Sequence, residues 1–205
     1  MPIRCCFFIL IIANLLFLPV AHSCELKVRT FAFPPLGMKS ATGQWQGLDM
    51  DYTKALLELA GCRYSFVDIP WARAVRLLKL GRVDLMLNVS KTKEREHTLH
   101  FVGPQRDEVM RFVSRKGKFP VISQWHQMET LEGTLMRQRG TYIGERLDRV
   151  LNKNLVLKNR MVTLAYTDVK IELLAMGRAD GFFAESSYLY HQLKTNKAFS
   201  IVEVH

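Results

Sequence analysis

Residues 85–95 read LMLNVSKTKER, an apolar run that turns into a short polar segment. The first three residues indicate a buried strand, and Ser90 or Thr92 can cap a short helix that carries Arg95. A strand that runs into a helix N-terminus presents backbone N–H groups and hydroxyls, which suit an anionic group. The arginine adds a fork of donors that fits a carboxylate. A solvated turn with a surface ion pair is the alternative.

Strands and helices alternate around this stretch. The expected elements are strands at 26–30, 63–67, 99–101 and 109–114 and helices at 48–60 and 71–80. The apolar face of the first helix should consist of Tyr52, Ala55, Leu56 and Leu59. Because strand and helix alternate, the crossovers should be right-handed and the sheet parallel.

A second α/β unit begins near residue 114. Its expected elements are helices at 123–132, 141–151 and 168–176 and strands at 135–137, 162–166 and 181–184, with Thr167 as the cap of the third helix. The pentapeptide LGRVD at residues 80–84 has a counterpart, MGRAD, at residues 176–180. Each stands between an expected helix and a buried strand, so the chain should form two similar lobes.

The N-terminus is typical of an export signal. Arg4 supplies a positive charge, residues 5–18 are apolar except for one asparagine, and Ala21 and Ser23 place small residues before a cleavage site. The run is shorter than the roughly 20 residues that span a membrane. We therefore expect residues 1–23 to be a cleaved signal peptide and the protein to be periplasmic. A lipoprotein signal ending at Cys24 is the alternative, which Ala21 disfavours because a leucine is expected there.

Two cysteines, Cys24 and Cys62, directly precede the first two expected strands. If these strands are parallel neighbours, their starts lie side by side, and an oxidising compartment would allow a disulfide. Metal binding is not expected, because the two cysteines bring no nearby pair of histidines, and His97, His100 and His126 lack ligand spacing.

The chain is basic, with 29 Lys and Arg against 19 Asp and Glu and a formal net charge of +10. The basic residues are scattered and form no stripe interleaved with aromatic residues, so nucleic-acid binding is not expected. The sequence also contains no nucleophile–base pair, metal cluster or phosphate loop. We therefore expect no cofactor and a binding protein rather than an enzyme.

From residue 25 to its end the chain resembles the periplasmic solute-binding proteins of family 3, the amino-acid-type receptors of ABC transporters. The motifs that carry the resemblance are GLDMD at 47–51, PWARA at 70–74, GRVD at 81–84, SKTKER at 90–95, RGT at 139–141 and GRAD at 177–180. The resemblance implies a two-lobed α/β periplasmic binding protein of type II, with parallel-sheet lobes joined at a hinge. Lobe 1 would cover residues 24–112 and lobe 2 residues 113–205. The return strand and C-terminal helices of lobe 1 have no counterpart in the sequence, which suggests a C-terminally truncated chain.

The resemblance also implies a carboxylate site. Arg95 matches the arginine that holds the α-carboxylate of the ligand, and Ser90 matches a hydroxyl residue beside it. Asn88 stands where a small polar residue makes contacts, and Thr141, at an expected helix start, matches a second donor to the carboxylate. An arginine and helix N–H groups together would neutralise an anion.

Three further residues complete the implied site. Glu185 falls where the family usually has an aspartate that binds the ligand ammonium, Phe33 where an aromatic ring packs over the ligand, and Trp71 on the pocket wall. Glu185 could instead favour the dipole of the last helix, and either aromatic residue could belong to the core.

The implied function is capture of a small polar solute, an amino acid or related carboxylate, between two lobes for ABC-type uptake. The implied partners are that ligand and a membrane permease, with the protein itself a monomer. A periplasmic dehydratase-like enzyme with Glu185 as its acid and a truncated, non-functional remnant are the alternatives.

Overall fold

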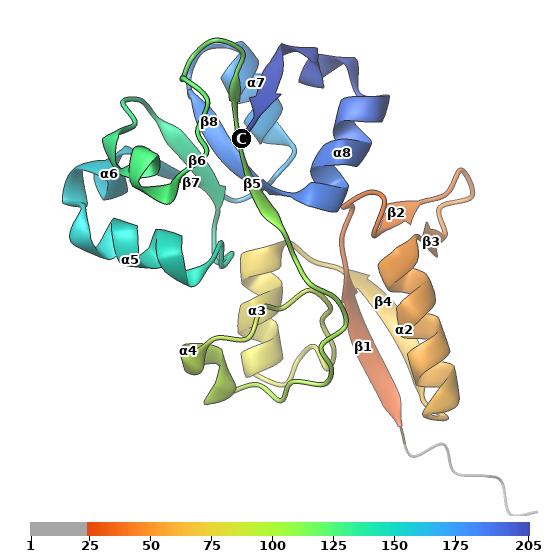
Figure 1. The fold of residues 1–205 in the computed structure, drawn as a ribbon. Coiled ribbons are helices and arrows are strands. Elements are labelled where there is room, and N and C mark those ends of the chain that lie inside the picture. The colour runs from red at the N-terminus through yellow and green to blue at the C-terminus, as the bar shows by residue number, and fades with distance from the viewer. Residues whose placement is uncertain (1–23) are drawn as a thin grey trace, which may run out of the picture.

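The computed structural model describes residues 24–205, which form two α/β lobes (Figure 1). Lobe 1 consists of β1 (Glu25–Thr30), β2 (Met38–Lys39), β3 (Trp45–Gln46), α2 (Leu48–Leu59), β4 (Arg63–Asp68), α3 (Trp71–Lys79) and α4 (Lys93–Glu96). Lobe 2 consists of β5 (Met110–Arg115), the 3-10 helix η1 (Trp125–Thr130), β6 (Leu135–Gln138), α5 (Glu145–Lys153), α6 (Leu155–Arg160), β7 (Met161–Leu164), α7 (Val169–Ala175), β8 (Gly181–Glu185), α8 (Ser186–Thr195), the 3-10 helix η2 (Lys197–Ile201) and β9 (Val202–Val204). The predicted signal peptide lies outside the described residues. Within them, no helix has the length and apolar character needed to cross a membrane.

The sheet of lobe 1 is smaller than predicted. β1 and β4 pair in parallel, from Glu25 opposite Arg63 to Thr30 opposite Asp68. The run that follows residue 84 contributes a single parallel bridge, between Leu85 and Val28, in place of the expected third strand. The chain leaves the strand direction soon afterwards because Asn88 adopts a left-handed conformation, with φ 58°. Residues 99–101, also expected to be a strand, have no regular structure.

Helix α2 buries a different face from the one predicted. Its buried residues are Asp49, Met50, Thr53 and Leu57, whereas Leu59 is 89 % exposed. At Gly47, directly before the helix, the backbone packs closely against the loop that follows β1. A Cβ at this position would lie 2.7 Å from the backbone oxygens of Pro35 and Leu36. A glycine is therefore required at this position. The Thr53 hydroxyl can be buried because it donates to the Asp49 carbonyl.

Lobe 2 contains a five-stranded mixed sheet in the order β7-β6-β8-β5-β9. The prediction of a parallel sheet is correct for β7, β6 and β8, whereas β5 and β9 run antiparallel to their neighbours. The predicted lobe boundary at residues 112 and 113 falls inside β5. Every residue of β8 is buried, as is usual for a central strand covered on both faces.

The two faces of this sheet carry separate cores (Figure 1). Phe182 packs with residues of α7, α8 and η2, while its neighbour Phe183 packs on the other side with residues of η1, α5 and α6. Successive side chains of a strand point to opposite faces, so an apolar pair in β8 supplies both cores.

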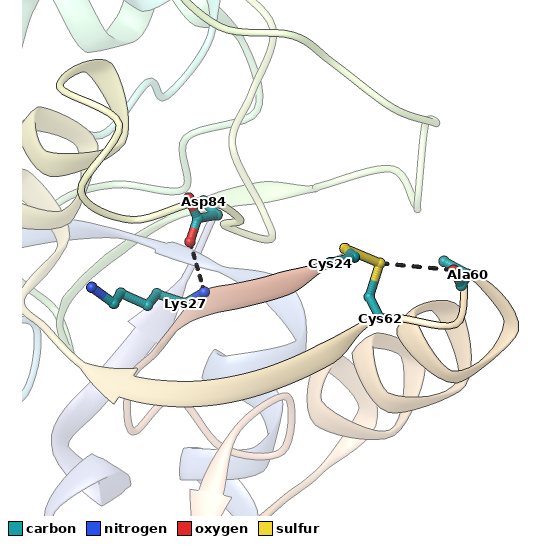
Figure 2. Close-up of a disulfide and its surroundings, with 5 residues drawn as sticks. All are labelled: Cys24, Lys27, Ala60, Cys62 and Asp84. Carbon is teal, nitrogen blue, oxygen red and sulfur yellow. Dashed lines mark hydrogen bonds between the residues drawn. A yellow bond between two sulfur atoms is a disulfide. The ribbon is translucent and has the colours of Figure 1, made fainter. Parts of the chain in front are cut away.

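The repeated pentapeptide has the same structural role in each lobe. Asp84 accepts a hydrogen bond from the backbone N–H of Lys27 in β1 at 2.8 Å (Figure 2). Asp180 accepts one from the backbone N–H of Thr134, directly before β6, also at 2.8 Å. Each aspartate thus connects the turn after a helix to the neighbouring strand.

The predicted disulfide between Cys24 and Cys62 is present, with a Cα–Cα distance of 4.8 Å. It joins the residues that precede β1 and β4 (Figure 2).

Three predicted helix starts in lobe 2 are wrong. The helix expected at residue 141 begins as α5 at Glu145, after Gly144, so Thr141 lies in a turn and its hydroxyl donates to the Gln138 carbonyl at 2.8 Å. The helix expected at 123–132 is the shorter 3-10 helix η1. Helix α7 is capped by Asp168 rather than Thr167.

Candidate functional site

A cavity of about 110 Å³ lies between the two lobes. Six of the seven predicted ligand-binding residues line it: Phe33, Trp71, Asn88, Ser90, Thr141 and Glu185. The first four come from lobe 1 and the last two from lobe 2. The structure therefore brings together residues that are up to about 150 positions apart in the sequence.

Arg95, the seventh residue, does not line the cavity and instead connects the lobes beside it. Its Nη1 donates to the Ser90 carbonyl and its Nη2 to the Gly140 carbonyl, both at 2.8 Å. Trp71 Nε1 donates to the same Gly140 oxygen at 2.9 Å. The side chain of Thr92, one of the two predicted caps, accepts from the Arg95 backbone N–H. Burial lowers the pKa of Arg95. These contacts bring Ser90 and Gly140-Thr141 together from opposite lobes.

Glu185 lies where it could serve the ligand, and it also caps the last long helix. It lines the cavity, and its Oε2 accepts from the Tyr188 backbone N–H at 3.1 Å, so it also caps α8. Its Oε1 accepts from Ser187 Oγ at 3.1 Å and from Arg106 Nη1 at 3.2 Å. The carboxylate therefore already has three donors.

Arg106 is a functional candidate that sequence reasoning missed. It connects Glu185 of lobe 2 to Glu108, whose Oε1 lies 3.6 Å from Arg106 Nη2. Glu108 lines the cavity and also accepts from the Ser90 hydroxyl at 3.3 Å. Burial raises the pKa of Glu108, and the positive charge of Arg106 opposes that rise. The cluster of charged residues at 106–108, just before β5, was the available signal.

Asp49 is a second acidic residue of the cavity wall that was missed. It is 4 % exposed, and burial raises the pKa of its carboxyl. Its oxygens accept from Asn88 Nδ2 and from Gln105 Nε2. The Asn88 Oδ1 atom is buried and has no hydrogen-bond partner among residues 24–205.

Two cations, Arg29 and Lys170, also line the cavity and were not predicted. Arg29 donates from Nε to the Ile69 carbonyl at 3.0 Å, and burial lowers its pKa to about 10. Lys170 donates from Nζ to the Phe183 carbonyl at 2.9 Å, and burial lowers its pKa to about 8. The signal for Lys170 was its position four residues before Leu174, on the buried face of α7.

Aromatic rings from both lobes form the remaining wall. Phe33 of lobe 1 stacks on Tyr188 of lobe 2, with 4.5 Å between ring centroids and 6° between ring planes. Burial raises the pKa of Tyr188 to about 12, so the phenol stays neutral at physiological pH. The Arg29 guanidinium lies over the rings of Phe31 and Trp71. Trp71 is also part of the core of lobe 1, so both predicted roles apply to it.

The cavity thus combines carboxylates, cations, an amide and aromatic faces in one small volume. This chemistry suits a small ligand that carries charges of both signs. Within the described residues, no three His, Cys, Asp or Glu side chains are grouped as metal ligands.

Residues 26–195 match the model of a family described as bacterial extracellular solute-binding proteins, family 3. The putative ABC transporter arginine-binding protein 2 of Escherichia coli K12 is 25 % identical over 176 residues, which cover 83 % of this chain and 67 % of that protein. The chain therefore spans about two thirds of the length of this relative.

Solved structures have the same fold. An ancestral arginine-binding protein bound to arginine matches with a TM-score of 0.74 and 22 % identity, over 89 % of this chain and 79 % of the other. An ancestral amino acid-binding protein, a precursor of cyclohexadienyl dehydratase, matches with a TM-score of 0.69 and 22 % identity, over 88 % and 76 %.

Proposed function

This chain belongs to the bacterial extracellular solute-binding proteins of family 3, and from that premise we propose that it captures a free amino acid or a related small carboxylate between its lobes. Its fold is that of a type II periplasmic binding protein. The observation that carries the proposal is the inter-lobe cavity, which is lined by six of the residues that the family resemblance selects.

The α-carboxylate of the ligand binds at Ser90 and Thr141. Arg95 lies outside the cavity and positions both residues, because it donates to the carbonyl of Ser90 and to that of Gly140, the neighbour of Thr141. A guanidinium placed there holds the two segments together and also contributes positive potential to the anion site.

The ligand ammonium binds on the acidic side of the cavity. Glu185, Glu108 and Asp49 supply negative charge there, and the unpartnered Oδ1 of Asn88 supplies an acceptor. Phe33 and Trp71 pack against the apolar part of the ligand.

We propose binding without catalysis. A general acid must donate a proton, whereas both oxygens of Glu185 accept hydrogen bonds in this structure. The protein would be a periplasmic monomer, exported by residues 1–23, that delivers its ligand to the permease of an ABC transporter.

A thermal-shift screen of the purified protein against amino acids, polyamines and small carboxylates tests the proposal. A ligand at 100 times its dissociation constant should stabilise the folded protein by about 2.7 kcal/mol. We expect a clear rise in melting temperature with at least one amino acid or carboxylate. A cooperative melt that none of these compounds shifts would contradict the proposal, and the absence of a cooperative melt would favour a non-functional remnant.

A further inference from the structure

Lys170 is a buried ammonium group on the wall of the cavity. It lies in the first turn of α7, beside the core residue Ile171, and is only 4 % exposed. Its Nζ makes one hydrogen bond, to the Phe183 carbonyl, although an ammonium has three donors. Among residues 24–205, no carboxylate oxygen lies within 4 Å of this nitrogen. The charge is therefore held in the protein without a counter-ion.

Two of the three carboxylates of the cavity differ from Lys170 in this respect. Glu108 and Glu185 both pair with Arg106. Asp49 accepts from two neutral side-chain amides and has no ion pair within 4 Å among the described residues. Arg29 likewise has no ion pair at that distance, but Asp68 and Asp49 act on it at longer range. Lys170 is thus the cation of the wall on which no carboxylate acts.

A buried ammonium without a counter-ion opposes folding, because one hydrogen bond and the Phe182 ring 5.7 Å away replace only part of its lost hydration. A neutral side chain such as methionine could pack on the same face of α7 without this cost. A charged group kept at such a position inside a cleft is a candidate for binding a ligand of opposite charge.

We propose that Lys170 binds a carboxylate on the side chain of the ligand, so that the solute is an acidic amino acid or a similar dicarboxylate. The inference rests on the function proposed above and specifies its ligand class. Two carboxylates on one ligand would occupy two positions. The first lies at the hydroxyls of Ser90 and Thr141, with the Arg95 guanidinium nearby, and the second lies at Lys170.

Calorimetry with pairs of acid and amide tests the inference. The probes are L-glutamate and L-glutamine, L-aspartate and L-asparagine, succinate, and L-arginine. The variants are Lys170→Met, which removes the charge at similar length, and Lys194→Met, which removes an exposed charge from α8 as the matched control. Melting temperatures of the ligand-free variants show whether each protein folds.

We expect the wild-type protein to bind an acidic probe at least tenfold more tightly than its amide or L-arginine. Lys170→Met should weaken binding of the acid by about 30-fold or more, abolish the preference over the amide, and leave the melting temperature unchanged or higher. Lys194→Met should bind as the wild type does.

Two outcomes would overturn the inference while leaving the proposed function intact. One is wild-type protein that prefers an amide or L-arginine to every acidic probe. The other is Lys170→Met that binds the acid with unchanged affinity. If Lys170→Met fails to fold, Lys170→Gln is measured instead and must show the same loss. A folded wild-type protein that binds no amino acid or carboxylate at all would contradict the proposed function itself.

Discussion

Trp71 and Gly140 join the two lobes through one hydrogen bond, from the indole Nε1 of lobe 1 to the backbone carbonyl of lobe 2, at 2.9 Å. The same oxygen accepts from Arg95, so two donors of lobe 1 converge on a single atom of lobe 2. Gly140 has a φ of 76°, which an alanine adopts only at a cost. We refer to this three-residue contact as the latch.

Trp71→Phe tests the latch. It removes the indole N–H and keeps most of the ring, so the core of lobe 1 should tolerate it. Loss of one neutral hydrogen bond is worth about 0.5–1.5 kcal/mol, and we expect ligand affinity to fall about threefold to tenfold in calorimetry. Trp45→Phe, outside the cleft, is the control. Equal affinities for wild type and Trp71→Phe would show that the latch does not contribute to closure.

Arg95→Ala should have a larger effect. It removes both charge-assisted hydrogen bonds that position the Ser90 and Gly140 segments, together with the positive charge behind the anion site. We expect a carboxylate ligand to bind at least about 100-fold more weakly. Arg82→Ala, at an exposed position of lobe 1, should bind normally. Calorimetric affinity retained by Arg95→Ala would remove this residue from the site.

The disulfide should account for much of the stability of lobe 1. It closes a loop across 38 positions, and the chain-entropy treatment gives such a crosslink about 3–4 kcal/mol. We expect Cys24→Ser/Cys62→Ser to unfold at a correspondingly lower urea concentration. A reducing agent should lower the midpoint of the wild type and leave that of the double variant unchanged; a double variant as stable as the oxidised wild type would contradict this.

Lys170 should make the ligand-free protein more stable at alkaline pH. Its pKa falls from 10.5 to about 8 on folding, so between these values the unfolded chain binds more protons and the free energy of unfolding rises with pH. The penalty is complete below pH 8 and disappears by about pH 10.5; its full size is about 3 kcal/mol. Lys170→Met should therefore be more stable than wild type at pH 7, and the difference should shrink toward pH 10. A constant difference across this range, measured by urea titration, would contradict the assignment.

The order of the main elements could be predicted from the sequence because it depends on local apolar periodicity and on turn residues such as Gly81 and Gly177. The buried face of α2 could not, since it depends on how the helix packs against segments distant in the chain. β9 was also missed, because its three residues acquire strand geometry only from pairing with β5.

The residues of the candidate site likewise fall into those that local sequence predicts and those that depend on distant contacts. Ser90, Thr141 and Glu185 could be selected because each falls in a motif with a fixed place in the chain. Arg106 and Lys170 belong to no motif, and their burial follows from the way distant segments pack. Charged residues are usually solvent-exposed, so the charge cluster at 106–108 and the position of Lys170 on the apolar face of its helix were weak signals for a cavity.

The latch consists only of protein atoms, so its hydrogen bonds can hold the two lobes together whether or not a solute is bound. A protein that exchanges between open and closed conformations has its apparent affinity reduced by the fraction that is not binding-competent. Each 1.4 kcal/mol contributed by the contacts at Gly140 increases the closed-to-open ratio tenfold. Substitutions at Gly140 or Arg95, neither of which lines the cavity, would therefore change how strongly the protein retains a bound solute.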